Sequence, residues 1–157
     1  MDSYDIKIIE LLQKDGRLSN KQMAAHVGPA PSTCLARTNA LVQRKVVKGV
    51  GARVDPKVMG VGIQAMLSIG IRVHSNSLFD GFLTYLRQLR EVHALFHTSG
   101  AVDVLVHVMV RDSDHLRGFV LDQISSRDEV NRCETSLIYE VERNDILPNY
   151  LDSGDDG

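Results

Sequence analysis

The 157-residue sequence contains no tryptophan, only four prolines and two cysteines, and aromatic residues make up 5% of it. Cys34 and Cys133 lie far apart and lack metal-ligand spacing, so reduced thiols are the simplest interpretation. No apolar run is long enough to span a bilayer. The acidic N-terminus lacks the basic and apolar regions of a secretory signal. These absences predict a cytoplasmic protein without a membrane partner.

Charge is distributed unevenly along the chain. Residues 1–60 contain ten lysines and arginines and five acidic residues, a formal net charge of +5. Residues 61–157 contain eight basic and fifteen acidic residues, a net charge of −7. A cationic head on an anionic body is typical of a protein whose head contacts phosphate groups, although chance clustering would give the same asymmetry.

Three helices are predicted in the cationic part. Residues 2–14 carry an apolar stripe of helical spacing and end at Asp15-Gly16. Ser19 followed by Gln22 has the spacing of a capping box, and Gly28-Pro29 ends the helix that this box begins. The third helix starts at Pro31.

The third helix is expected to carry the functional surface of the head. Cys34, Thr38 and Leu41 follow the i, i+4, i+7 pattern of an inward face, which leaves the other face exposed. This layout is typical of a helix-turn-helix whose second helix enters the major groove of DNA, whereas a plain helical hairpin is the alternative. The predicted contacts to bases or phosphates are Ser32, Thr33, Arg37 and Asn39, and the predicted contacts to the DNA backbone are Arg17, Lys21, Arg44, Lys45 and Lys48.

The anionic part predicts a different architecture. Its strands are expected over residues 63–73, 92–98, 103–110 and 130–142, and its helices over residues 78–90 and 113–126, capped by Asn76 or Ser77 and by Ser113. This order is that of a ferredoxin-like βαββαβ domain, so the fold class is α+β. An antiparallel sheet covered by helices on one face leaves apolar residues on its other face, among Met66, Leu67, Ile69, Val106, Val108 and Ile138. A second copy of the sheet is the expected cover, which predicts a homodimer.

These predictions divide the chain into four parts. Residues 1–45 form the helix-turn-helix domain, residues 46–61 an extended linker, residues 62–150 the ferredoxin-like domain and residues 151–157 a disordered tail.

Several short motifs in this order resemble the Lrp/AsnC family of bacterial and archaeal transcription regulators over nearly the whole chain. They are Asp5-Ile6-Lys7-Ile8-Ile9, Asp15-Gly16-Arg17-Leu18-Ser19, Pro31-Ser32-Thr33, Ala52-Arg53-Val54-Asp55-Pro56 and Ser99-Gly100-Ala101-Val102-Asp103. The resemblance implies a helix-turn-helix head that binds double-stranded DNA. It also implies dimers that assemble into tetramers, octamers or larger discs, and a free amino acid bound between neighbouring dimers.

The resemblance also implies the location of the amino-acid effector. The loop Ser99, Gly100, Ala101, Val102 and Asp103 would wrap it, and Thr135 and Ser136 would line the same cleft. An acidic group for the ammonium and backbone N–H donors for the carboxylate suit an α-amino acid. A hairpin turn at Gly100, a turn cap at Asp103 and ordinary sheet positions for the two hydroxyls are the alternatives.

The sequence departs from the family at three places. Ala30 stands at the N-cap of the third helix and cannot cap it, and Ala36 and Ala40 stand where relatives often have arginine. Ala101-Val102 replaces a polar and an aromatic residue in the effector loop. Each missing cation removes a phosphate contact, so several heads per assembly would be needed for firm DNA binding.

Two other functions remain open at this stage. A sensor that has lost DNA binding and acts through oligomerisation would fit the three departures. A tetrapyrrole decarboxylase of the same architecture would need catalytic histidines, but no histidine forms a recognisable triad or ligand set. We therefore predict no catalytic residue, metal ligand or cofactor.

Overall fold

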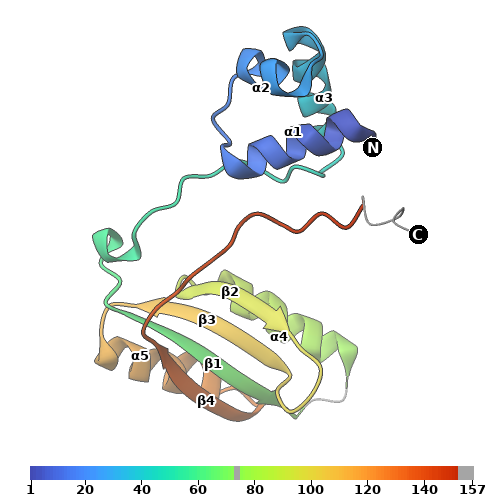
Figure 1. The fold of residues 1–157 in the computed structure, drawn as a ribbon. Coiled ribbons are helices and arrows are strands. Elements are labelled where there is room, and N and C mark those ends of the chain that lie inside the picture. Colours follow the sequence, from blue (N-terminus) through green and yellow to red (C-terminus); the bar gives the residue numbers. More distant parts are fainter. Residues whose placement is uncertain (73–74, 152–157) are drawn as a thin grey trace, which may run out of the picture. The chain divides into compact units, whose positions relative to one another are not determined.

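The computed structural model describes residues 1–72 and 75–151, which form two compact units. The first unit, here called the head, consists of residues 1–53 and the C-terminal segment that begins at Glu142 (Figure 1). The second, here called the body, spans Val54–Val141. The sequence-based boundaries placed residues 142–150 with the body, whereas the structure groups them with the head. Of the predicted disordered tail, all but Leu151 lies outside the described residues.

The head contains the three predicted helices, α1 (Ser3–Lys14), α2 (Asn20–Val27) and α3 (Pro31–Gln43). Asp2 and Ser19 each close a capping box at the start of α1 and α2. Gly28 ends α2 with a φ of +104°, a conformation that a side chain would disfavour. The head core is small and consists of Ile8, Met23, Val27, Cys34 and Leu41, all at most 5% exposed.

The end of α3 has the hydrogen bonds of a Schellman motif. The Val46 N–H donates to the Leu41 carbonyl (2.9 Å) and the Lys45 N–H donates to the Val42 carbonyl (2.9 Å). Such a motif needs a residue in the left-handed conformation, usually glycine, and here Lys45 takes it with a φ of +58°. The chain then continues without helix or strand until the short 3-10 helix η1 (Pro56–Met59).

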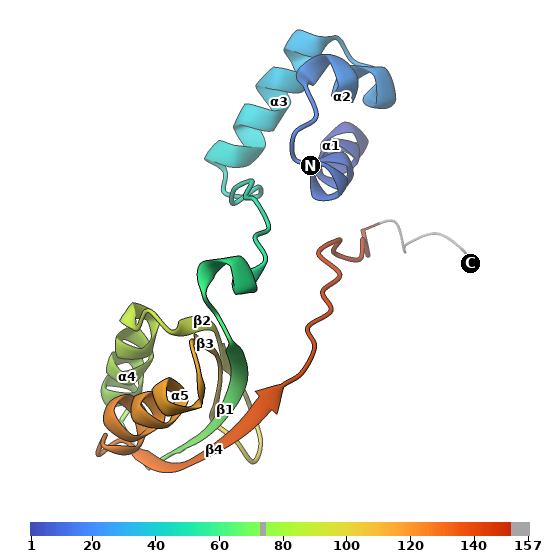
Figure 2. The ribbon, with the colours of Figure 1, turned by 90° about the vertical axis from the view of Figure 1, so that its left-hand side faces the viewer.

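The body is a four-stranded antiparallel sheet in the order β2-β3-β1-β4, with both helices on one face (Figures 1 and 2). The elements are β1 (Ile63–Ile71), α4 (Asn76–Gln88), β2 (Val92–His97), β3 (Val104–Val110), α5 (Ser113–Phe119) with a following π-helical turn η2 (Val120–Ser125), and β4 (Val130–Ile138). The predicted ferredoxin-like arrangement is therefore confirmed.

The core of the body lies between the sheet and its helices. Leu67, Val106 and Val108 point to this side and are fully buried together with Phe82 and Leu86 of α4. No helix of the described residues is long and apolar enough to cross a membrane.

Details at the helix ends differ from the predictions. Ser75, rather than Asn76 or Ser77, occupies the N-cap of α4 and makes no side-chain cap bond. Asp112, rather than Ser113, caps α5 by accepting a hydrogen bond from the His115 N–H (2.8 Å). Aspartate one residue upstream offers a stronger acceptor to the positive end of the helix dipole, which explains this difference.

The other face of the sheet carries no helix (Figure 2). Cross-strand pairing places Met66 beside His107 and Ser136, and Leu105 beside Ser68 and Phe96. Of the six apolar residues considered for this face, Met66 and Ile138 lie on it, while Leu67, Ile69, Val106 and Val108 point into the core. We call this surface the open face and define it by Met66, Phe96, Leu105, His107, Met109 and Ile138.

Candidate nucleic-acid interface and effector loop

The apolar residues of α2 and α3 fix the orientation of the two helices. Met23 and Val27 of α2 and Leu41 of α3 pack on Ile8 of α1 in one buried cluster. Cys34 is fully buried, as the predicted inward face requires. The turn between α2 and α3 spans only Gly28–Ala30. The short turn and the shared apolar cluster give the helix-turn-helix geometry, which presents the outer face of the second helix to solvent.

The exposed face of α3 contains three of the four residues predicted to contact bases or phosphates. Ser32, Thr33 and Asn39 are exposed. Leu35 and Val42 are also 45% and 50% exposed, so the same helix offers apolar groups that could contact thymine methyl groups. Ala30, in the N-cap position, has the extended backbone of a cap but makes no side-chain bond, as predicted.

Arg37 already has partners within the head. One terminal nitrogen, Nη1, donates to both carboxylate oxygens of Asp2 (2.9 and 2.8 Å) and to Oδ1 of Asp5 (2.8 Å). Its guanidinium also lies 5.5 Å from the ring centroid of Tyr4. Arg37 therefore joins α3 to the beginning of α1, and a DNA phosphate would have to compete with two carboxylates for it.

These contacts shift the charges involved. The hydrogen bond from the Asp5 backbone, followed by the contacts with Arg37, holds the pKa of Asp2 below its usual value. The hydrogen bonds to Asp5 and Asp2 raise the pKa of Arg37. Both shifts favour the charged forms of Asp2 and Arg37, so their ion pair is kept at neutral pH and weakens only as acid protonates Asp2.

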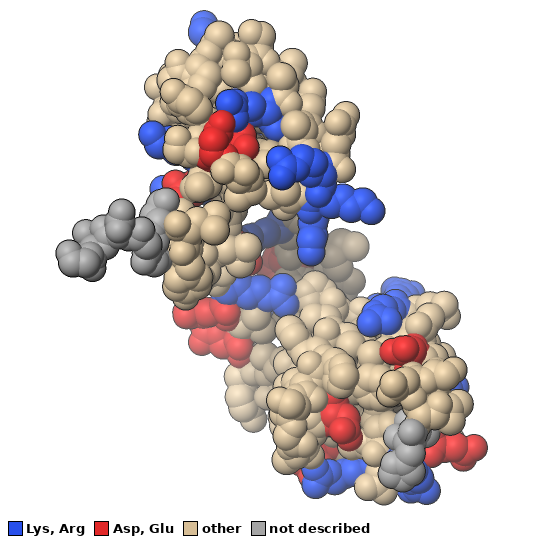
Figure 3. Space-filling view, turned by 90° about the vertical axis from the view of Figure 1, so that its right-hand side faces the viewer, with Lys and Arg blue, Asp and Glu red and all other residues tan. Residues whose placement is uncertain are grey.

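The other predicted backbone contacts are free to approach a duplex. Lys21 at the start of α2 and Arg44, Lys45 and Lys48 after α3 are exposed, as is Arg17 between α1 and α2. Figure 3 shows several lysine and arginine side chains on the surface of the head. Flexible cations around an exposed helix suit phosphate contacts, which position a protein without reading sequence.

The predicted effector loop between β2 and β3 is closed by its own hydrogen bonds. Thr98 Oγ1 donates to the Val102 carbonyl (2.5 Å), and Gly100 takes a φ of +121°. Oδ2 of Asp103 accepts a hydrogen bond from the Ile71 N–H of β1 (2.7 Å), and the Asp103 N–H donates to the Ile69 carbonyl (3.2 Å). One carboxylate oxygen of Asp103 thus has a structural role.

The structure brings one residue to this loop that the sequence analysis missed. Arg132 of β4 donates from Nη2 to the Ala101 carbonyl (3.1 Å). Its guanidinium would suit a ligand carboxylate, but only the fold reveals this proximity because 31 positions separate the two residues. Thr135 and Ser136 pair with Leu67 and Met66 and so point to opposite faces of β4. A single chain therefore does not direct both hydroxyls to one site.

The histidines make contacts that the sequence did not predict. His115 Nε2 lies 3.1 Å from Oε1 of Glu91, and His107 Nε2 lies 2.9 Å from Oε1 of Gln64. The His93 and His107 rings meet edge to face with centroids 5.2 Å apart. In residues 1–72 and 75–151, no three histidine, cysteine or acidic side chains are grouped as a metal ion would require.

Two family models match the chain in tandem. The AsnC-type helix-turn-helix domain covers residues 1–42, and the Lrp/AsnC ligand binding domain covers residues 64–145. The chain belongs to the Lrp/AsnC family. It therefore combines the DNA-binding and ligand-binding domains of a family of transcription regulators.

Individual Lrp/AsnC relatives agree with this assignment. The chain is 35% identical over 140 residues to the HTH-type transcriptional regulator AldR of Mycobacterium tuberculosis. The aligned residues make up 89% of this chain and 78% of AldR. Its fold is similar to that of the transcriptional regulator NMB0573 of Neisseria meningitidis, solved in complex with L-Met. The superposition with NMB0573 has a TM-score of 0.85 at 30% sequence identity, and it covers 94% of this chain and 96% of the other. AsnC of E. coli gives a TM-score of 0.79 at 25% identity, covering 92% and 97% of the two chains.

Proposed function

We propose that the protein is a sequence-specific DNA-binding transcription regulator whose output responds to a small effector, an amino acid. DNA binding is assigned to the head, and effector binding and self-association are assigned to the body. The observation that carries the proposal is the exposed outer face of α3, held by a buried apolar cluster and surrounded by cations, in a chain whose relatives are named HTH-type transcriptional regulators.

For DNA, Ser32, Thr33 and Asn39 are assigned to base edges, and Lys21, Arg44, Lys45 and Lys48 to phosphates. Arg37 is assigned to phosphate only through an exchange of partners, because Asp2 and Asp5 hold it in the free protein. A selection from random duplexes should enrich one sequence, and Thr33→Ala should weaken binding to that sequence more than to an unrelated one. Equal loss on both duplexes would contradict the base-contacting role.

For the effector, the loop 99–103 is assigned to binding, with Asp103 Oδ1 for the ammonium and Arg132 as an additional partner for the carboxylate. NMB0573, a relative of the same fold, was solved in complex with L-Met, which supports an amino acid as the class of effector. A thermal-shift screen of the twenty amino acids should identify a ligand that raises the unfolding midpoint by mass action.

Asp103→Asn is the sharpest variant for the effector assignment. The amide oxygen of asparagine still accepts the hydrogen bond from the Ile71 N–H, but the negative charge that would pair with the ammonium is lost. The midpoint without ligand should stay close to that of the original chain, while the ligand-induced shift should be abolished. A retained shift would contradict the role of Asp103.

Self-association through the open face supplies the two heads that half-site recognition requires, with recognition helices about 34 Å apart. Assembly of dimers into tetramers or octamers would place neighbouring effector loops together, as the family resemblance implies. The apolar residues Met66, Leu105 and Phe96 on a face without helices support this part of the proposal.

One group of observations favours a second candidate, a sensor that acts through oligomerisation without binding DNA. Arg37 is engaged by carboxylates, Ala36 and Ala40 occupy exposed positions of α3, and Ala30 leaves the helix uncapped. Amino-acid-dependent changes in oligomer size without binding to any selected duplex would favour this candidate over the regulator.

A further inference from the structure

The C-terminal segment Glu142–Leu151 lies on the head although it follows directly from the last part of the body. It forms no helix or strand, and it contacts two different elements. The Leu147 N–H donates to Oε1 of Gln13 on α1 (2.7 Å), and Asn149 Nδ2 donates to Oε1 of Glu10 (3.4 Å). Asp145 pairs with Arg53 of the segment between α3 and η1, residues 44–55, which we call the connector.

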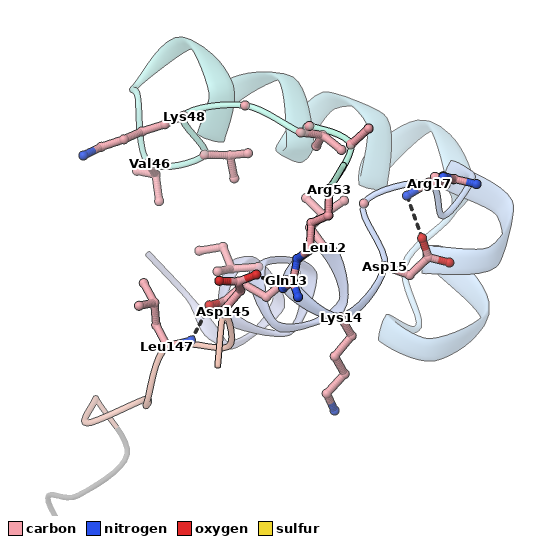
Figure 4. Close-up of a pocket in the computed structure, with 17 residues that line it drawn as sticks. Leu12, Gln13, Lys14, Asp15, Arg17, Val46, Lys48, Arg53, Asp145 and Leu147 are labelled. Carbon is pink, nitrogen blue, oxygen red and sulfur yellow. Dashed lines mark hydrogen bonds and ion pairs between the residues drawn. The ribbon is translucent and has the colours of Figure 1, made fainter. Parts of the chain in front are cut away.

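These contacts close one side of a groove with a volume of about 990 Å³ (Figure 4). Ile9 and Leu12 of α1 form one wall, and Val46, Val47 and Val50 of the connector form another. In Figure 4, Leu147 lies next to Gln13, and Lys14 and Lys48 point away from the groove. The groove therefore offers an apolar floor with polar contacts at its edge, which suits an extended peptide.

The connector contacts the turn after α1. A Cβ atom at Gly16 would lie 2.4 Å from Cγ1 of Val50, so Val50 packs directly on the turn after α1. The segment itself is shaped by local turns, since Asn144 Oδ1 accepts from the Ile146 N–H (3.1 Å) and Asn149 Oδ1 accepts from the Leu151 N–H (3.0 Å). Together with Pro148, these turns reduce the conformational entropy that docking costs.

We propose that α1 and the connector form a docking surface for the C-terminal segment of the same chain, which lies along one edge of the groove and acts as a strap on the head. The head alone has a core of few residues, and a domain of this size is marginally stable. It gains from the hydrogen bonds and the ion pair of the segment, whose apolar side chains Ile146 and Leu147 stay 44% and 72% exposed. Covalent attachment keeps the segment at high effective concentration, which makes several weak contacts sufficient.

The strap has a structural consequence for the whole chain. The chain passes between the two units twice, at Arg53–Val54 and at Val141–Glu142, and the pair Arg53–Asp145 joins residues near both crossings. β4 carries Arg132, which contacts the effector loop, and continues towards the strap.

A charge exchange on the full-length chain tests the strap. In the original chain, hydrogen–deuterium exchange of the Leu147 N–H should be at least several-fold slower than in a free peptide of residues 142–157. Arg53→Asp and Asp145→Arg should each accelerate exchange several-fold towards the peptide rate, and the double variant should restore protection. Glu142→Gln is the matched control, because it removes a negative charge of the same segment outside the contacts described, and it should leave protection unchanged.

Three results would overturn the proposal. The first is a Leu147 N–H that exchanges at the peptide rate in the original chain. The second is a double variant no better protected than the single ones. The third concerns mixtures of isotope-labelled and unlabelled chains: contacts between Leu147 and Gln13 found only between different copies would show a strap from a second copy. Because the readout uses neither DNA nor an amino acid, it is independent of the proposed function.

Discussion

At the scale of single residues, Arg37 shows how one side chain can have two competing roles. Sequence position assigned it to DNA, because it follows Ser32 and Thr33 on the outer part of the recognition helix. The structure joins it to Asp2 and Asp5, which lie 35 and 32 positions earlier in the chain. Its first role is therefore to position α3 against α1, and any contact with phosphate requires that this cluster opens.

The Arg37 cluster predicts an acid-sensitive contribution to the stability of the head. The folded-state pKa of Asp2 is lowered, so this contribution is complete above the ordinary carboxyl pKa, about 4, and is lost as the pH falls through the lower folded value. Arg37→Gln should lower the unfolding midpoint at pH 7 by about 2 °C only, because exposed ion pairs contribute little. Below about pH 4, the midpoint of this variant should depend less on pH than that of the original chain. Thermal unfolding of Arg37→Lys, which keeps the charge, is the control. If the unfolding midpoint of Arg37→Gln fell with decreasing pH as steeply as that of the original chain, the role of the cluster would be contradicted.

At the scale of elements, α3 carries two local defects that can be corrected separately. At its start, Ala30 has cap geometry without an acceptor. Ala30→Ser should add about 1 kcal/mol to the free energy of unfolding of the head, because the hydroxyl accepts a backbone N–H of the first turn. Ala36→Ser, in the middle of the same helix, should instead destabilise slightly. Denaturant unfolding followed by circular dichroism measures the free energy of unfolding of both variants. Equal effects of the two serines would contradict the cap explanation.

At its end, α3 closes through Lys45 in a left-handed conformation that favours glycine. Lys45→Gly should stabilise the head by about 0.5–1 kcal/mol, since relief of backbone strain exceeds the added entropy of the unfolded chain. The same change removes a cation, so DNA affinity should fall while stability rises. Lys45→Ala removes the cation but keeps the strain, and a similar stability of the alanine and glycine variants would contradict the explanation.

The predictability of the elements follows from the range of the interactions that determine them. Apolar periodicity and local caps determine α1, α2, α3 and the strands, so their order and most of their bounds could be predicted. Four features could not be predicted. They are the π-helical turn at the end of α5, the partners of Arg37, the contact of Arg132 with the effector loop and the docking of Leu147 on Gln13. Each of these depends on packing or on pairs that are far apart in the sequence, for which a local pattern gives no signal.

At the scale of the whole molecule, the open face of the body should mediate self-association. Met66 lies on this face in the central strand β1, paired with His107 and Ser136. Met66→Glu should shift the protein from dimers to monomers, because a carboxylate buried between two sheets would lack a partner. Leu121→Glu places the same charge on an exposed position of the helix layer and should leave the dimer intact. Sedimentation of both variants, with circular dichroism to confirm folding, measures this. A dimeric Met66→Glu chain would exclude the open face as the interface.

We expect α3 and its surrounding cations to bind duplex DNA, and the salt dependence of the affinity is the decisive measurement. Fluorescence anisotropy with a duplex obtained by selection should give an association constant whose logarithm falls linearly with log salt concentration, with a slope of about −0.9 for each phosphate contacted. Replacing Lys21 and Lys48 by alanine together should reduce the magnitude of the slope by about 2 in each head while the fold is retained. No measurable binding at low salt, or an affinity that does not change with salt and with these two substitutions, would contradict the account.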